Sequence, residues 1–309
     1  MSDWSKITDI SKVYKSTPID FHEALGVDKA IPLGNMSFCD IGGIDLGGGM
    51  REPEGNLLVS VRQFNYWIET DGVTRCSHML GDFLGARAYH FAVTDRNFRF
   101  IRSLKCQYKN LYALEDMRLV RFGDVVQSSA TNVMYGPVLY RIFQHDLLIR
   151  GIAGGSVMFT KPVVFPNVRE KNYIPDASEK GAYITDICDG YILTAKGKRQ
   201  YRKTRSRCEG AEKCSGSSQL FGWMRDGKDM RVALVHKRMD ERYINAFAFF
   251  DRTLSSCRIS RWFSVFGDRS PVNFTCGMSI DGDIATLPIC VNDGETHLFR
   301  VPICDFFPG

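Results

Sequence analysis

The chain has 309 residues, of which 44% are hydrophobic and 24% are charged, and its formal net charge is +5. A chain of this length and composition can bury a substantial core, either as one large domain or as two medium ones. The net charge is small for the length, which argues against a dedicated nucleic-acid-binding protein but suits an anionic small substrate.

The cysteines and the N-terminus give expectations about the compartment. Ten cysteines are spread along the chain, with no C-x-x-C pair and no His/Cys spacing typical of a tetrahedral zinc site. The segment 1–6 lacks the apolar run of a signal peptide, and no stretch approaches the ~20 apolar residues that span a bilayer. We therefore expect a cytoplasmic protein without a membrane span, whose cysteines are free and mostly buried.

The first predicted element is a short helix, the only one that the sequence indicates. Thr17 suits the N-cap, Pro18 the first helical position and Asp20 the first turn, while Gly26 can end the helix. The glycine-rich segment 42–49 follows. It lacks the lysine of a phosphate-binding loop and precedes no helical pattern, so we expect an irregular loop there.

From residue 56 onward, the sequence repeats short runs rich in Val, Ile, Phe and Tyr, separated by clusters of Gly, Asp, Asn or Arg. Short strands at near-regular spacing, without helices between them, indicate an all-β sandwich, barrel or propeller. The segments 226–228 (DGK) and 281–283 (DGD) lie between apolar runs and predict hairpin turns.

One segment breaks this composition. The run 196–207 (KGKRQYRKTRSR) is densely basic and has no apolar period, so we expect a long exposed loop. Two interpretations stay open: a solvated surface segment, or a rim that attracts phosphate or an anionic glycan.

The most informative stretch is 114–118 (LEDMR), in which two adjacent carboxylates and an arginine precede an apolar run. A β-rich enzyme would place its acid or base in such a cluster at the start of a strand. The alternative is a structural ion pair that closes the strand end.

Further short segments appear in a fixed order around this stretch. They are 61–66 (VRQFNY), 170–175 (EKNYIP), 233–236 (ALVH), 274–278 (FTCGM) and 291–293 (VND). Together with 114–118, they resemble segments of the five-bladed β-propeller enzymes related to the mannoside phosphorylases of glycoside hydrolase family 130, and of the β-mannosyltransferases that share that fold. The resemblance extends over roughly residues 50 to 305. It implies a five-bladed β-propeller over 50–309, with residues 1–49 forming an N-terminal segment of one helix and a glycine-rich loop that packs on the propeller.

The chain departs from the family pattern at three places. Met117 replaces the proline of the E-D-P-R motif, and Tyr173 replaces the tryptophan that follows E-K-N. The basic run replaces an aromatic segment, which leaves the sugar specificity open.

The resemblance also implies a site. In a propeller, the innermost strands line a central channel, so polar residues from different blades converge at one end of it. The implied catalytic residue is Asp116, as the proton-transferring group. The implied substrate-binding or phosphate-binding residues are Arg62, Asn65, Tyr66, Glu115, Arg118, Lys171, Asn172, Tyr173, His236 and Asp293.

Each of these residues has a simpler interpretation. Arg62 could be satisfied by a buried carboxylate, and Lys171 could be ordinary surface. His236 could be a hydrogen-bonded core histidine, and Asp293 could belong to a turn. Glu115 and Arg118 could support Asp116 instead of binding substrate.

The residue types nevertheless favour one kind of chemistry. An inverting hydrolase needs two carboxylates, whereas a single carboxylate beside Arg, Lys and His suits attack by, or departure of, a phosphate. Together with the resemblance, and with a basic run that could hold additional donor phosphates, this implies an inverting glycosyltransferase that uses an activated sugar donor on a glycan acceptor. The alternatives are a mannoside-type glycoside phosphorylase and a non-catalytic glycan-binding propeller. We expect no metal or other cofactor, with a sugar nucleotide or sugar phosphate as substrate, and no nucleic-acid partner.

Overall fold

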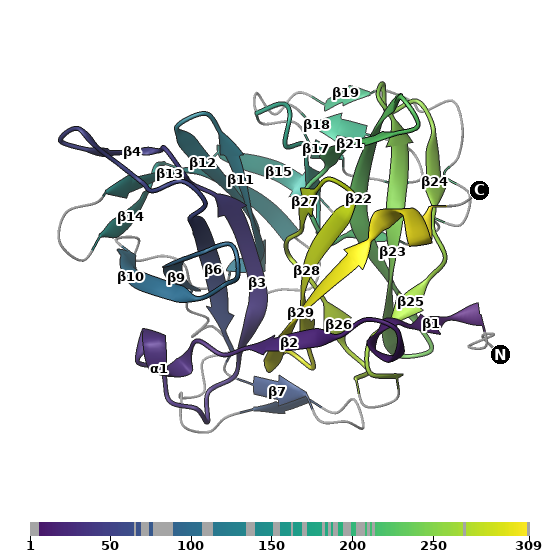
Figure 1. The fold of residues 1–309 in the computed structure, drawn as a ribbon, viewed down its shortest axis with the longest axis horizontal. Helices are drawn as coiled ribbons and strands as arrows, with labels where there is room; N and C mark the ends of the chain where they lie inside the picture. The colour runs from purple at the N-terminus through teal and green to yellow at the C-terminus, as the bar shows by residue number, and fades with distance from the viewer. Residues whose placement is uncertain are drawn as a thin grey trace.

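The structure is a computed structural model. It describes residues 6–64, 66–68, 74–76, 89–106, 114–133, 140–150, 155–161, 163–168, 172–180, 183–184, 187, 191–193, 199–201, 208, 211, 214–267 and 270–307. These residues form a nearly all-β chain that contains one α-helix in its described part, α1 (His22–Leu25). Strands of successive chain segments form five blades around a centre, as a β-propeller (Figure 1).

The first two blades share a continuous sheet. The strands of the first blade are β3 (Leu33–Asp40), β6 (Leu57–Gln63), β9 (Tyr89–Thr94) and β10 (Phe100–Cys106). Those of the second are β11 (Leu114–Phe122), β12 (Val125–Val133), β13 (Tyr140–Arg150), β14 (Ser156–Phe159) and β15 (Val163–Val168). A short parallel pairing of β10 with β14 joins them.

The third and fourth blades follow in chain order. The third contains β16 (Ile174–Pro175), β17 (Tyr183–Ile184), β18 (Tyr191–Leu193) and β19 (Arg199–Tyr201). The fourth contains β20 (Ser215–Gly216), β21 (Phe221–Arg225), β22 (Lys228–Met239), β23 (Arg242–Asp251), β24 (Cys257–Ile259) and β25 (Phe263–Ser264), with β1 (Thr8–Asp9) paired to β25. Its innermost strand is broken into β20 and β21, both of which pair with β22.

The last blade combines both ends of the chain. Its strands are β26 (Asn273–Phe274), β27 (Ser279–Asp281), β28 (Ile284–Val291), β29 (Glu295–Pro302) and β2 (Ser16–Ile19). The antiparallel pairing of β2 with β29 closes the ring, and Figure 1 shows the purple N-terminal strand beside the yellow C-terminal one. The smaller elements are the hairpins β4 (Asp45–Gly47) with β5 (Met50–Arg51) and β7 (Tyr66–Ile68) with β8 (Thr74–Cys76), and the 3-10 helices η2 (Ile10–Lys12) and η5 (Ile303–Phe306).

The core lies between neighbouring blades. In β22, Val232 and Leu234 pack toward the last blade, whereas Ala233 and Val235 pack toward the third. Because side chains alternate across a strand, a sheet buried on both faces needs apolar residues at successive positions. This explains the continuous apolar runs of β22 and β23.

The predicted helix is correct at its end and wrong at its start. Gly26 ends α1 with a left-handed backbone (φ 67°), but the residues expected to begin the helix form β2. Proline is tolerated in an edge strand, so pairing with β29 outweighs the local helix signals of Thr17 and Pro18. Asp20 instead accepts a hydrogen bond from the backbone N–H of His22 at 2.9 Å.

Other expectations can be compared with the strands directly. The turns at Asp226-Gly227 and Gly282-Asp283 are confirmed, since each connects two paired strands through two residues. The glycine-rich segment 42–49 was expected to be an irregular loop, but it contains β4 and the turn of the β4–β5 hairpin, which Gly48 and Gly49 make with positive φ. The boundary expected at residue 50 falls inside the first blade, because β3 precedes it and pairs with β6.

Two further expectations are corrected. The basic run was expected to be entirely loop, but its residues Arg199–Tyr201 form β19, because they pair with β18. The cysteines were expected to be free, but Cys208 and Cys257 form a disulfide. Within the described part of the chain, no helix has the length and apolar character needed to cross a membrane.

Candidate active site

Asp116 lies near the start of β11, the innermost strand of the second blade, at an irregularity of the sheet. The β11–β12 register shifts between Glu115 and Arg118, which leaves one extra residue on β11, and Asp116 has a left-handed backbone with φ 54°. Such bulges redirect side chains and are concentrated near active sites. The structure thus gives Asp116 a special backbone position that the sequence alone does not reveal.

Arg62 brings a cation to this carboxylate from the first blade. It lies on β6, and its Nη2 is 3.0 Å from Oε1 of Glu115 while its Nη1 is 3.6 Å from Oδ1 of Asp116. The guanidinium also lies 4.5 Å from the centre of the Phe64 ring. Arg62 and Asp116 are buried, so their attraction is screened much less than that of a surface pair. Arg62 is on the second strand of its blade, whereas the sequence reasoning expected a first strand.

Arg118 connects three blades and fixes the backbone of Asp116. Its Nη1 donates to the Asp116 carbonyl at 2.8 Å, and its Nη2 donates to the Gly216 carbonyl at 2.7 Å and contacts Oδ1 of Asn172 at 3.4 Å. These contacts make it a positioning residue. Its Nε has no hydrogen-bond partner among the described residues.

Gly216 is required where the third and fourth blades approach each other. Its N–H donates to the Asn172 carbonyl at 3.0 Å. A Cβ at this position would lie 2.4 Å from Cγ1 of Ile174 and 2.6 Å from the Asn172 carbonyl oxygen, closer than side chains tolerate. Asn172 itself has a left-handed backbone (φ 69°).

His236 lies on β22, beside this contact. One of its ring nitrogens, Nδ1, is 2.7 Å from the hydroxyl of Ser217, and its ring meets Phe274 edge to face at 4.7 Å between centroids. The residue is buried. This arrangement is that of a hydrogen-bonded histidine at the edge of the core, linked to the Arg118 contact through the Gly216-Ser217 backbone.

Asp293 lies in the β28–β29 turn, as the simpler interpretation expected. Asn292 and Asp293 both have positive φ, 51° and 53°. The turn nevertheless reaches the site, because the Asp293 backbone lies near Gly34, the cross-strand partner of Arg62.

Two neutral groups that the sequence reasoning missed complete the surroundings of Asp116. The Tyr89 hydroxyl accepts a hydrogen bond from the Met117 N–H at 3.1 Å, and burial raises the pKa of this phenol. Burial also raises the pKa of Cys276, which lies close enough to Asp116 to feel its charge. A raised pKa disfavours the thiolate, which is the nucleophilic form of cysteine. No local sequence signal marks Tyr89, whereas Cys276 lies within the segment 274–278 that contributes to the resemblance.

The structure therefore brings together Arg62, Glu115, Asp116, Arg118 and Asn172, with His236 and Asp293 at the periphery. Tyr173 is buried and packs with Tyr183 at 6.3 Å between ring centroids, a core position unlike a stacking platform for sugar. Asn65 and Lys171 lie outside the described residues, as does the side chain of Tyr66. Among the described residues, no group of three or more His, Cys, Asp or Glu side chains could hold a metal ion.

Comparisons with known proteins show which solved structures have a similar fold. Neither protein-family models nor curated protein sequences give a match. Among solved structures, β-1,2-mannobiose phosphorylase from Listeria innocua, in complex with β-1,2-mannobiose, matches with a TM-score of 0.53 and 15% identity. The match covers 94% of this chain and 98% of that one.

Two further solved structures agree. A glycosyl hydrolase from Bacteroides ovatus has a TM-score of 0.51 and 12% identity, over 90% of this chain and 86% of that one. A structure from a study of glycoside hydrolase family 130 enzymes that target β-1,2 mannosidic linkages in Candida mannan has a TM-score of 0.51 and 11% identity, over 88% and 84%. The chain thus has the propeller fold of these glycoside phosphorylases and hydrolases, as the resemblance implied.

Proposed function

We propose that this chain is an inverting glycosyl-transferring enzyme that moves a mannose-like residue between a glycan hydroxyl and phosphate. The observation that carries the proposal is the position of Arg62 beside Asp116, with Nη1 3.6 Å from Oδ1. A proton-transferring carboxylate and a cationic donor side by side are what phosphorolysis requires. The solved enzymes with this fold supply the substrate class, because one of them is a mannobiose phosphorylase.

The proposed reaction is a single displacement. A phosphate oxygen forms a bond to the anomeric carbon from the face opposite the glycosidic oxygen, and the glycosidic C–O bond breaks. The electron pair stays on the departing glycan oxygen, which takes the proton of the Asp116 carboxylic acid. Because one displacement occurs, the anomeric configuration inverts. In the synthetic direction, Asp116 accepts the proton of the acceptor hydroxyl as phosphate departs toward the cation.

Neighbouring residues have supporting roles in this proposal. Arg118 holds the Asp116 backbone through its carbonyl, and Glu115 orients Arg62 through the 3.0 Å contact. His236 and Lys171 remain proposed phosphate contacts on the basis of the family resemblance.

Transfer from a sugar nucleotide is the second candidate. The basic run favoured it, as a place for additional donor phosphates. The part of that run that the structure describes is β19, the strand of its sheet farthest from the inner strand β16. This topology weighs against a role for Arg199–Tyr201 at the channel, so we place phosphate ahead of a nucleotide diphosphate.

The test is a turnover panel. The purified chain is incubated with β-1,2-mannobiose and phosphate, with mannose 1-phosphate and a manno-oligosaccharide, and with GDP-mannose and the same acceptor. We expect turnover with phosphate or mannose 1-phosphate, reduced about 10²–10⁴-fold by Asp116→Asn.

The matched control is Arg258→Gln, an exposed residue on β24 of the fourth blade. Turnover with GDP-mannose alone would support the second candidate instead. Glycan binding without turnover, unchanged by Asp116→Asn, would show a non-catalytic propeller and overturn the proposal.

A further inference from the structure

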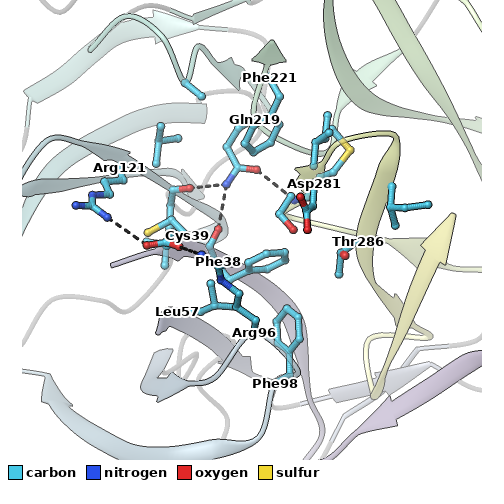
Figure 2. A pocket seen from close by; sticks show the side chains of 18 of the residues that line it. Phe38, Cys39, Leu57, Arg96, Phe98, Arg121, Gln219, Phe221, Asp281 and Thr286 are labelled. Carbon is cyan, nitrogen blue, oxygen red and sulfur yellow. Dashed lines mark hydrogen bonds and ion pairs between the residues drawn. The ribbon is translucent and has the colours of Figure 1, made fainter. Parts of the chain in front are cut away.

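A cavity lies toward the other end of the strand that carries Asp116. Asp116 is near the start of β11, whereas Leu119, Val120 and Arg121, toward the end of that strand, line a cavity of about 710 Å³. Asp40, at the end of β3, lines it as well. The residues that line it include none of those assigned to the candidate active site (Figure 2).

Gln219, a buried residue, lines this cavity. Its amide nitrogen donates to the carbonyls of Phe38, at 3.3 Å, and of Leu119, and its amide oxygen accepts from the Met278 N–H at 3.2 Å. The side-chain amide of Gln219 is therefore bonded to β3, to β11 and to the backbone just before β27, which belong to three other blades. Figure 2 shows these hydrogen bonds inside the cavity lining.

Apolar side chains also line the cavity. Phe38 and Phe98 meet edge to face at 4.9 Å between centroids, and Leu57 and Ile280 also line it. Small-molecule sites combine such apolar linings with a few fixed polar groups.

Three arginines provide polar groups in the lining. Arg121 and Arg96 share the carboxylate of Asp40, at 3.2 Å and 3.5 Å, so one carboxylate balances two guanidinium groups. The third, Arg300, donates to Oδ1 of Asn97 at 3.1 Å. The other lining carboxylate, Asp281, lies on the opposite side of the cavity from Arg121 (Figure 2). The lining therefore has three guanidinium groups and two carboxylates, an excess of positive charge.

A turn with strained backbone holds the part of the cavity lining around Phe98 in place. Phe98 has a left-handed backbone (φ 61°), which is unusual for a bulky residue. The Asp95 side chain accepts hydrogen bonds from the N–H groups of Asn97, at 2.8 Å, and Arg99, at 2.9 Å. Strained backbone that is held by its surroundings is concentrated at ligand sites. Here it places the Phe98 ring in the lining and Arg96 and Asn97 at the rim.

We propose that this cavity binds a small organic phosphate, with its organic part against the apolar lining and the phosphate at Arg96, Arg121 and Arg300. The charge and the lining select this class, because guanidinium groups bind phosphate through charge-assisted hydrogen bonds and small-molecule sites combine an apolar lining with a few polar groups. The site is distinct from the one in the proposed function and does not depend on it.

The test is isothermal titration calorimetry of the full chain with adenosine 5′-monophosphate, adenosine and inorganic phosphate. We expect the nucleotide to bind more tightly than either part, and Arg121→Gln to weaken its binding about tenfold, as expected for one lost charge-assisted contact. Asp40→Asn should strengthen binding, because it removes the carboxylate that competes with the phosphate. Arg258→Gln on the fourth blade should leave binding unchanged.

The opposite effects of Arg121→Gln and Asp40→Asn on nucleotide affinity distinguish a binding site from a structural ion-pair cluster. In such a cluster, both substitutions would change the affinity in the same direction. Absence of nucleotide binding at millimolar concentration would overturn the proposal. Binding that is unchanged in Arg121→Gln but lost in Asp116→Asn would also overturn it, because that result would place the nucleotide at the candidate active site.

Discussion

At the scale of single residues, the candidate active site depends on close contacts between blades. Arg118 holds carbonyls of the second and fourth blades, at Asp116 and Gly216, and the Gly216 N–H bonds the third. Partners 98 residues apart in the chain, such as Arg118 and Gly216, cannot be paired from local sequence patterns. The motif at 114–118 indicates a charged cluster, but the roles of Gly216 and Tyr89 come only from the fold.

Gly216 provides a sharp test of this packing. Gly216→Ala should lower the free energy of unfolding by about 1–3 kcal/mol, because the new methyl group overlaps Ile174 and the Asn172 carbonyl. The matched control is Gly222→Ala on β21, where a Cβ would meet nothing within 4 Å. Urea unfolding monitored by fluorescence measures both. Equal stability of the two variants would contradict the proposed close approach of the third and fourth blades.

At the scale of elements, local sequence signals predict the hairpin turns, but pairing between the two ends of the chain overrides them at the expected start of the helix. The hairpin turns were predictable because Asp226 and Gly227 adopt positive φ values that their residue types favour. The start of the helix was not predictable, because the residues expected there form β2, which pairs with β29 far along the chain. The bulge with the left-handed backbone at Asp116 was not predictable from local sequence either, since a bulge depends on the register of two strands.

The β2 closure predicts a position-specific effect of charge. Ile19 packs against the apolar cluster that contains Phe38, Val59 and Leu298, whereas Thr17 on the same strand is exposed. Ile19→Asp should lower the free energy of unfolding by about 1–3 kcal/mol, because a carboxylate loses hydration there. Thr17→Asp should change it by less than about 0.5 kcal/mol. Thermal unfolding compares them, and an equally mild effect at Ile19 would argue against closure by β2.

At the scale of the whole molecule, the two ends of the inner strands have different chemistry. At one end, Asp116 lies beside Arg62. At the other end is a cavity lined by Gln219 and three arginines. The resemblance of short motifs predicted the propeller and the first of these ends. The second could not be predicted, because Asp40, Arg96, Arg121 and Arg300 belong to no common motif and meet only when the ring of blades closes.

In the proposed function, Asp116 transfers the proton in an inverting displacement with phosphate. Proton and phosphorus NMR of the chain with β-1,2-mannobiose and phosphate tests it most directly. We expect α-mannose 1-phosphate as the product, formed at a normal rate by Arg258→Gln and about 10²–10⁴-fold more slowly by Asp116→Asn. A β-configured product, or an unchanged rate in Asp116→Asn, would contradict the claim.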